Sequence, residues 1–217
     1  MNGSDIKRMI LDLFFPQHLK CHSCGREAVV NEYGICDKCE KELLFVSDPG
    51  KIDGIDVFYS PLQYNDTVRR AMIPFKYNGA LYKKEFLAHH VSIPESWQAD
   101  CIVPVPLHEN RLKGRGYNQS AVLAGELASR SGLPLREDIL IRIKDTPKQA
   151  QMGRRERMKN VKNAFKASDE CRDMSIILFD DVRTTGSTLS ECARELKKHG
   201  ANQVYAVTAC CSMEEVK

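Results

Sequence analysis

The sequence has no long apolar run and almost no net charge. None of its apolar stretches approaches the ~18 residues that a membrane-spanning helix needs, so we expect no membrane span. The 32 Lys and Arg residues nearly cancel the 29 Asp and Glu residues, leaving +3. With 42% hydrophobic residues, 28% charged residues and a mean hydropathy of −0.39, the composition excludes a disordered or fibrous chain. The 217 residues suffice for one full domain with a small module attached.

The chain also lacks the features of a secreted, disulfide-bonded protein. Its nine cysteines cannot all pair within one chain, because the count is odd. The apolar segment 9–15 contains Asp12 and no small-residue cleavage site, which argues against a secretory signal. We expect residues 6–14 to form a short helix packed on the protein body, with a membrane-surface or partner-binding helix as the alternative. A cytoplasmic location follows as the default, and a reducing compartment favours metal binding over disulfides.

Four of the cysteines have the spacing of a zinc site. They form two Cys-x-x-Cys pairs separated by eleven residues: Cys21 with Cys24, and Cys36 with Cys39. Two thiolates separated by two residues can reach the same metal ion, and four thiolates complete a tetrahedral shell. Two redox dithiols are the alternative, but no thioredoxin-like context surrounds either pair. We therefore predict a zinc ribbon whose closed shell serves folding or contact rather than catalysis.

From Gly54 onward, short apolar strands alternate with helical patterns. We expect strands near residues 55–59, 100–103, 139–143, 175–179 and 204–209, and helices near residues 66–73, 82–91, 118–131 and 187–199. This alternation predicts an α/β fold with a parallel sheet and right-handed crossovers. We place the boundary of the two units near residue 50, which gives a zinc-binding module over 1–50 and an α/β domain over 51–217. The five cysteines outside the ribbon are expected to be core residues.

The segment 176–188, IILFDDVRTTGST, carries the most chemistry. It runs from a buried strand through a tight loop into a helix, and ligands of open α/β sheets bind at that end of the strands. Residues Thr184, Thr185, Gly186, Ser187 and Thr188 can present backbone N–H groups and four hydroxyls to a phosphate. The adjacent carboxylates of Asp180 and Asp181 suit ribose hydroxyls, with magnesium nearby. No Gly-Lys-Ser/Thr ending is present, so the loop is not a Walker A loop.

This segment resembles the phosphoribosyl pyrophosphate motif of type I phosphoribosyltransferases. The motif consists of four apolar residues, two acids, an apolar residue, a variable residue and a Thr/Ser/Gly-rich loop, and every position matches here. The resemblance implies that residues 184–188 hold the 5-phosphate and that Asp180 and Asp181 hold the ribose hydroxyls. It also implies a type I phosphoribosyltransferase-like parallel sheet flanked by helices, with magnesium bound together with the ligand. Arg183, at the variable position, is a further source of positive charge.

Other motifs narrow the resemblance to the ComF family of competence proteins. They are FKYNG (75–79), VPVPLH (103–108), RGYNQ (115–119) and the N-terminal four-cysteine module. The resemblance covers nearly the whole chain, although Pro74 lies where a helix would otherwise continue. Proteins of this kind are linked to DNA uptake in natural transformation, where they act after DNA entry with a helicase partner. The resemblance therefore implies binding of phosphoribosyl pyrophosphate and contact with single-stranded DNA and with other transformation proteins.

The small net charge conceals a basic block. Residues 107–166 hold 14 Lys/Arg and 6 Asp/Glu, a balance of +8, so the rest of the chain carries −5. Such a block is usually a solvated face, but here it adjoins the phosphate loop, where a pyrophosphate or a DNA backbone would need cations. The candidate contacts are Lys76, Arg111, Lys113, Arg115, Arg154, Arg155 and Arg157.

Two classes of function stay open at this stage. The first is an enzyme that displaces pyrophosphate from phosphoribosyl pyrophosphate with an acceptor that no residue identifies, either in DNA uptake or in nucleotide salvage. The second is an adaptor in which the phosphoribosyl site serves as a ligand sensor or DNA contact. Both hypotheses predict that phosphoribosyl pyrophosphate binds, so measured pyrophosphate release would distinguish them.

Overall fold

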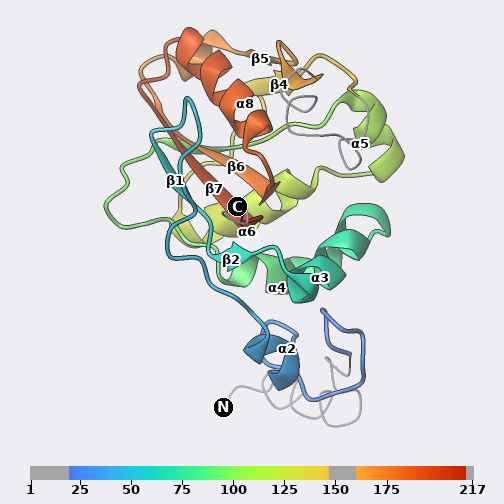
Figure 1. Cartoon of the computed structure of the whole chain (residues 1–217). Helices are drawn as coiled ribbons and strands as arrows, with labels where there is room; N and C mark the ends of the chain where they lie inside the picture. The colour runs from blue at the N-terminus through green and yellow to red at the C-terminus, as the bar shows by residue number, and fades with distance from the viewer. Residues whose placement is uncertain (1–19, 147–159, 214–217) are drawn as a thin grey trace, which may run out of the picture.

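The computed structural model describes residues 20–146 and 160–213, and a parallel sheet organises most of them (Figure 1). The strand order is β1-β7-β6-β3, and β2 also pairs with β7. All these pairings are parallel. The strands are β1 (Val57–Tyr59), β2 (Leu62–Gln63), β3 (Cys101–Pro104), β6 (Ser175–Arg183) and β7 (Gln203–Cys211). The predicted α/β fold with a parallel sheet is confirmed.

The central strands are buried on both faces, as their continuous apolar runs predict. In β6, Ile176 and Leu178 pack into one core, whereas Ile177 and Phe179 pack into the other. This alternation follows from the two-residue period of a strand, which points successive side chains to opposite faces. Each face of the sheet therefore needs its own covering layer.

Helices cover both faces (Figure 1). One core joins the sheet to three helices: α3 (Asp66–Tyr77), α4 (Lys84–His89), which follows the short 3-10 helix η1 (Leu81–Lys83), and α6 (Gln119–Ser131). The other core joins the sheet to α8 (Ser187–Lys198) and to a small hairpin. Asn65 and Asn118 cap α3 and α6 with their side chains, and Gly132 ends α6 at a φ of +74°.

Five elements differ from the sequence-based expectation. The strand predicted near residues 139–143 is β4 (Leu140–Arg142), which lies outside the parallel sheet and pairs antiparallel with β5 (Phe165–Ala167). A helix, α5 (Glu109–Arg115), follows β3 in a segment for which no helix was predicted, and the 3-10 helix η3 (Asp169–Cys171) precedes β6. Helix α3 continues through Pro74 to Tyr77, because full burial of Phe75 keeps the last turn in place.

The zinc-ribbon residues form a separate lobe below α3 and α4 (Figure 1). Its short helix α2 (Asp37–Lys41) begins at Cys36, and its buried cysteines, Ile35 and Leu43 share one core with α3 and α4. The helix expected over residues 6–14 lies outside the described residues. No helix in the described ranges has the length and apolar character needed to cross a bilayer.

Candidate functional site

The predicted phosphate loop lies at the carboxyl end of β6. That strand extends through Arg183, so Asp180 and Asp181 belong to the end of the strand rather than to the loop. Thr184 and Thr185 follow, and Gly186 begins α8 in the left-handed region at a φ of +78°. A glycine cap offers no side-chain acceptor to the first N–H groups of the helix. The Ser187 hydroxyl lies 2.8 Å from that of Thr185, which groups the hydroxyls at this helix terminus.

The acid pair is held by two different elements. Ser120 Oγ, at the start of α6, donates to Asp180 Oδ1 at 2.8 Å, and the backbone N–H of Asp181 donates to the same oxygen at 2.9 Å. Burial, and then the neighbouring carboxylate of Asp181, raise the pKa of Asp180 to about 7. The side chain of Asp181 is only 4% exposed, so this carboxylate requires a positive partner.

Lys76 supplies that partner. Its Nζ lies 2.7 Å from Asp181 Oδ2, and its side chain is 20% exposed. Burial by itself would lower the pKa of Lys76, but the charges of Asp181 and Asp180 outweigh it and raise the pKa above its usual value. The lysine comes from the last turn of α3, a helix more than a hundred residues from the acids in sequence. The sequence placed Lys76 among the cationic contacts, and the structure places it directly against the acid pair.

A cavity of about 400 Å³ connects these groups. Its lining gathers both acids, part of the phosphate loop and cationic side chains from three elements, α3, α5 and β4: Asp180, Asp181, Thr184, Thr188, Lys76, Arg111, Arg115 and Arg142. Residues 184–188, with Thr185, Gly186 and Ser187 among them, surround a smaller adjoining hollow. A site with hydroxyls at one end and cations at the other has the chemistry to bind a ligand that carries more than one phosphate.

Not every candidate contact reaches this cavity. Lys113 points to solvent, with a 75% exposed side chain that pairs with Glu109. Arg183 also turns away from the ligand side, because its guanidinium donates to the carbonyl oxygens of Pro49, Thr184 and Ser212. Arg154, Arg155 and Arg157 lie outside the described residues.

Sequence reasoning missed two residues of the cavity. Ser120 directly follows the RGYNQ motif, and its contact with Asp180 depends on the packing of α6 against β6. Arg142 belongs to β4, where it donates to Thr146 Oγ1 at 2.5 Å, and burial followed by the charge of Arg111 lowers its pKa. Arg142 could have been recognised from the sequence as a basic residue at the end of an apolar strand.

The four predicted zinc ligands meet at one point. The sulfur atoms of Cys21, Cys24, Cys36 and Cys39 all lie within 4.8 Å of one another, close to the ~3.8 Å separation in a tetrahedral zinc–thiolate site. Burial would raise the pKa of Cys21, but backbone N–H groups, first that of Cys36, donate to its sulfur and lower its pKa to about 7. The donor set and its geometry fit zinc, and no other group of three or more potential ligands occurs among the described residues.

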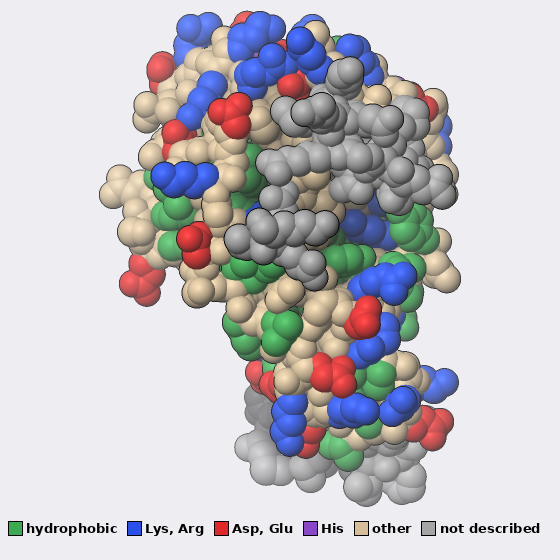
Figure 2. Space-filling view, in the orientation of Figure 1, with side chains coloured by type: hydrophobic (Ala, Val, Ile, Leu, Met, Phe, Trp, Pro, Cys, Tyr) green, Lys and Arg blue, Asp and Glu red, His purple; other side chains and the backbone are tan. Residues whose placement is uncertain are grey.

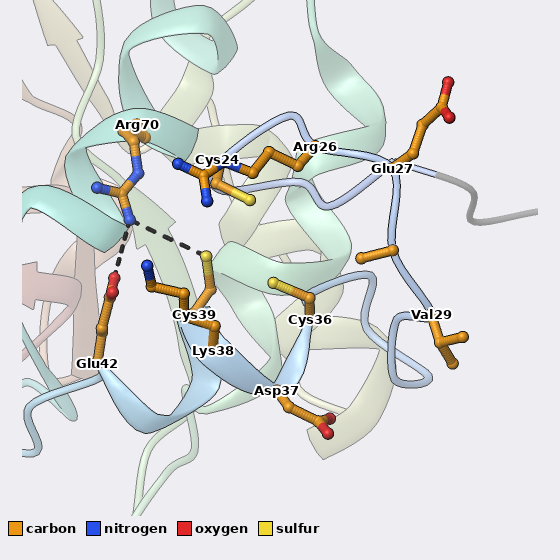
Figure 3. A pocket seen from close by; sticks show the side chains of 11 residues that line it. Cys24, Arg26, Glu27, Val29, Cys36, Asp37, Lys38, Cys39, Glu42 and Arg70 are labelled. Carbon is orange, nitrogen blue, oxygen red and sulfur yellow. Dashed lines mark hydrogen bonds and ion pairs between the residues drawn. The ribbon is translucent and has the colours of Figure 1, made fainter.

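The α/β domain places two cationic side chains near this cluster. Arg70 of α3 extends toward the cysteines, with Nη2 3.9 Å from Cys39 Sγ and 3.0 Å from Glu42 Oε2 (Figure 3). Lys83, buried at 5% exposure, donates to the backbone carbonyl of His22. A zinc ion with four thiolates has a net charge of −2, so the two cations offset the charge of the loaded site.

Further contacts tie the ribbon to α3. Ser23 Oγ donates to the Thr67 carbonyl at 2.8 Å, and Thr67 Oγ1 donates to Glu42 Oε2 at 2.8 Å. A hollow of about 520 Å³ opens beside the cysteines, and Figure 3 shows Arg26, Lys38 and Arg70 around it. Its lining includes three of the four cysteines, so part of this volume is the space that the metal ion fills.

The surface view shows basic side chains both at the top of the molecule and on its lower part, which carries the ribbon (Figure 2). Figure 2 shows Lys and Arg side chains gathered at the top of the molecule, over the end that carries α8 and β5. Three basic residues of α8 are paired: Arg194 with Glu191, Lys197 with Asp56, and Lys198 with Glu195. The cations that line the cavity therefore form a group distinct from these paired surface residues.

Comparison with known proteins matches both parts of the chain. Residues 118–217 match the family described as the phosphoribosyl transferase domain, and residues 10–50 match the double zinc ribbon domain. The chain is 30% identical over 186 residues to competence protein ComFC of Bacillus subtilis, which covers 83% of this chain and 72% of that protein. It is 36% identical over 119 residues to competence protein F of Haemophilus influenzae, covering 54% of this chain and 50% of that protein.

A third relative carries a different name. The chain is 35% identical over 111 residues to DNA utilization protein YhgH of Escherichia coli K12, covering 51% of this chain and 49% of that protein. The matched segments thus span about half the length of the Haemophilus and Escherichia relatives.

Proposed function

Because the chain belongs to the ComF family, with a phosphoribosyltransferase domain and a zinc ribbon, we propose that it binds phosphoribosyl pyrophosphate and acts in DNA uptake. The competence and DNA-utilization names of its relatives support the physiological role. Within that role, the protein contacts single-stranded DNA and a helicase partner.

The observation that carries the ligand proposal is the composition of the cavity. It places the hydroxyls of Thr184 and Thr188, the acid pair and four cationic side chains around one volume. Phosphoribosyl pyrophosphate needs the same three kinds of group: donors for its 5-phosphate, acceptors for its ribose hydroxyls and cations for its pyrophosphate. In the proposed complex the 5-phosphate lies at the amino end of α8, and the pyrophosphate faces Arg111, Arg115 and Arg142.

Magnesium enters this proposal with the ligand. Among the described residues, two adjacent carboxylates line the cavity, which is too few to hold an octahedral Mg²⁺ ion without the phosphates of a ligand and water. When bound, magnesium would neutralise the pyrophosphate and polarise its bond to the sugar.

An active phosphoribosyltransferase, in nucleotide salvage or related metabolism, is the second candidate. The cluster of Arg111, Arg115 and Arg142 favours it, since cations that stabilise a departing pyrophosphate accelerate its displacement. The acceptor attacks the anomeric carbon, the bond from that carbon to pyrophosphate breaks, and pyrophosphate leaves with the electron pair. Release of pyrophosphate, measured with candidate bases and with DNA, distinguishes this activity from binding alone.

Calorimetry with phosphoribosyl pyrophosphate and magnesium tests the ligand proposal. Thr188→Val removes one cavity hydroxyl while keeping the side-chain shape, and we expect it to weaken binding about 10-fold, as expected for a lost hydrogen bond to a charged group. Ser131→Ala, at the end of α6 remote from the cavity lining, is the matched control and should bind as the wild type does. Absence of binding heat in the wild type would refute the proposal.

Salt dependence tests contact with DNA. A protein that neutralises several phosphates loses affinity steeply as salt rises, so single-stranded DNA should dissociate between ~50 and ~200 mM salt. Arg111→Gln and Arg115→Gln should lower that slope if these residues contact the strand. Affinity that does not change over the same range would contradict backbone contact. A transformation assay in which each variant replaces the native copy then tests the role in uptake.

A further inference from the structure

The acid pair is already occupied by a cation. Lys76 Nζ lies 2.7 Å from Asp181 Oδ2, and the aspartate side chain is 4% exposed. Lys76 lies in the last turn of α3, which the fully buried Phe75 anchors and Asn78 caps. The position of the ammonium group is therefore restrained by this helix. A charge held this close is part of the site and not a mobile surface group.

This arrangement disfavours a divalent ion on the same carboxylate. A Mg²⁺ ion ligated by Asp181 would lie within a few ångströms of the ammonium, in a buried setting where like charges repel strongly. The Asp180 carboxylate is engaged as well, because Ser120 and the backbone of Asp181 donate to its Oδ1. The acids therefore do not form a magnesium site of their own.

Asp181 nevertheless keeps the capacity to bind a ligand hydroxyl. Oδ2 is buried, and Lys76 Nζ at 2.7 Å is its partner; no hydroxyl or backbone N–H of the described residues donates to it. Since a carboxylate oxygen has two acceptor sites, Oδ2 can accept a second hydrogen bond, from a sugar hydroxyl. Lys76 and Asp181 both line the cavity, so such a hydroxyl has access to them.

We propose that Lys76 is the resident cation of the phosphoribosyl site: it pairs with Asp181 and positions this carboxylate for a ribose hydroxyl, without a divalent ion at that carboxylate. Lys76 acts through Asp181 and is thus a positioning residue. The ligand class is a ribose 5-phosphate carrying a free diol, and magnesium is required only by a ligand that brings its own pyrophosphate. This inference rests on the proposed function, since it concerns the same ligand.

Binding of ribose 5-phosphate to the full-length, zinc-loaded protein tests it. This probe has the diol and the 5-phosphate but no pyrophosphate to bring magnesium. Calorimetry is performed with and without magnesium, and magnesium is omitted rather than chelated so that the ribbon keeps its zinc. The wild type should bind equally well in both conditions.

Two variants then distinguish the role of Lys76 from that of Asp181. Lys76→Met should weaken binding about 10-fold or more without magnesium, because Asp181 is then no longer held in place for the ribose hydroxyl. Magnesium should restore part of this loss by binding at the vacated carboxylate. Lys76→Met combined with Asp181→Asn leaves no unpaired buried charge and therefore keeps the fold stable. It should bind as weakly as the single variant and should not respond to magnesium. Lys198→Met, at the far end of α8, is the control and should match the wild type.

The outcomes are distinct. The inference is overturned if Lys76→Met binds like the wild type, if it shows no response to magnesium, or if the double variant retains wild-type affinity. If Lys76→Met does not fold, the double variant and Lys76→Arg decide, because the arginine retains the charge and should bind within about 10-fold of the wild type. Wild-type protein that binds neither ribose 5-phosphate nor phosphoribosyl pyrophosphate overturns the proposed function itself, and this inference with it.

Discussion

Removal of zinc should be detectable in helix α3 as well as in the ribbon. The ribbon has few buried apolar side chains of its own, so without metal we expect residues 20–45 to unfold locally. Its contacts with α3 would then be lost, above all the bond from Ser23 Oγ to the Thr67 carbonyl and the bond from Thr67 Oγ1 to Glu42. The amino-terminal half of α3 would lose the ribbon residues that contact it, while the parallel sheet stays folded.

The size of the effect follows from these two bonds. Each is buried or partly buried, and such a bond contributes about 1 kcal/mol net. Losing both should make local opening of α3 easier by about 2 kcal/mol, which corresponds to about 30-fold faster amide exchange in that helix. The hydrogen bonds from Asn65 and Arg70 to Glu42 are exposed and add little, and the contact of Arg70 with Cys39 Sγ is long, at 3.9 Å.

Hydrogen–deuterium exchange before and after removal of zinc measures this directly. Peptides from residues 66–77 should exchange faster without zinc, and peptides from residues 187–198 of α8, which packs on the opposite face of the sheet, should not change. Faster exchange confined to the ribbon would refute coupling through α3. Equal acceleration in α8 would show that the two lobes unfold as one and would also refute the reasoning.

Three further predictions concern single positions. Gly186→Ala should lower the melting temperature and weaken phosphoribosyl pyrophosphate binding, because a Cβ at a φ of +78° costs roughly 1–2 kcal/mol and would lie 3.2 Å from Ile52; unchanged melting would contradict it. Gly34→Ala should reduce the amount of bound zinc measured by metal analysis, since the added Cβ would overlap the His22 ring. The control Gly25→Ala also places a Cβ at a positive φ, but no atom lies within 4 Å of it, so this variant should keep its zinc. Burial and the Asp181 carboxylate raise the pKa of Asp180 from 3.8 to about 7, so the protonated Asp180 stabilises the fold fully below pH ~4 and this stabilisation is lost as the pH rises through 7. The melting temperature of Asp180→Asn should therefore rise relative to that of the wild type between pH 4 and pH 8. A difference in melting temperature that stays constant over this range would exclude the raised pKa.

The sequence predicted the elements whose residues carry their own local pattern. The apolar run of β6 shows burial on both faces, and the Cys-x-x-Cys spacing shows a shared metal ion before any contact is known. The phosphate loop was recognisable because a strand, two acids and a Thr/Gly loop are contiguous in the chain. Such features depend on neighbours in sequence.

Elements that depend on tertiary contacts were missed. Helix α5 has no buried residue, so its sequence lacks the apolar face by which an amphipathic helix is recognised. Strand β5 is only three residues long, too short to show a period, and it exists through pairing with β4. The contacts of Lys76 with Asp181 and of Ser120 with Asp180 join distant segments, and no local pattern encodes them.

The burial of the remaining cysteines gives the protein two chemically different sets of thiols. Cys101, Cys171, Cys192, Cys210 and Cys211 are each 0% exposed, and burial raises the pKa of Cys101 to about 11. Alkylating reagents react with accessible thiolates, so these five should stay unmodified in the folded protein. The ribbon cysteines should be protected only while a metal ion binds them. Mass spectrometry of the labelled native protein therefore counts metal occupancy molecule by molecule, with four added groups marking each chain that has lost its zinc.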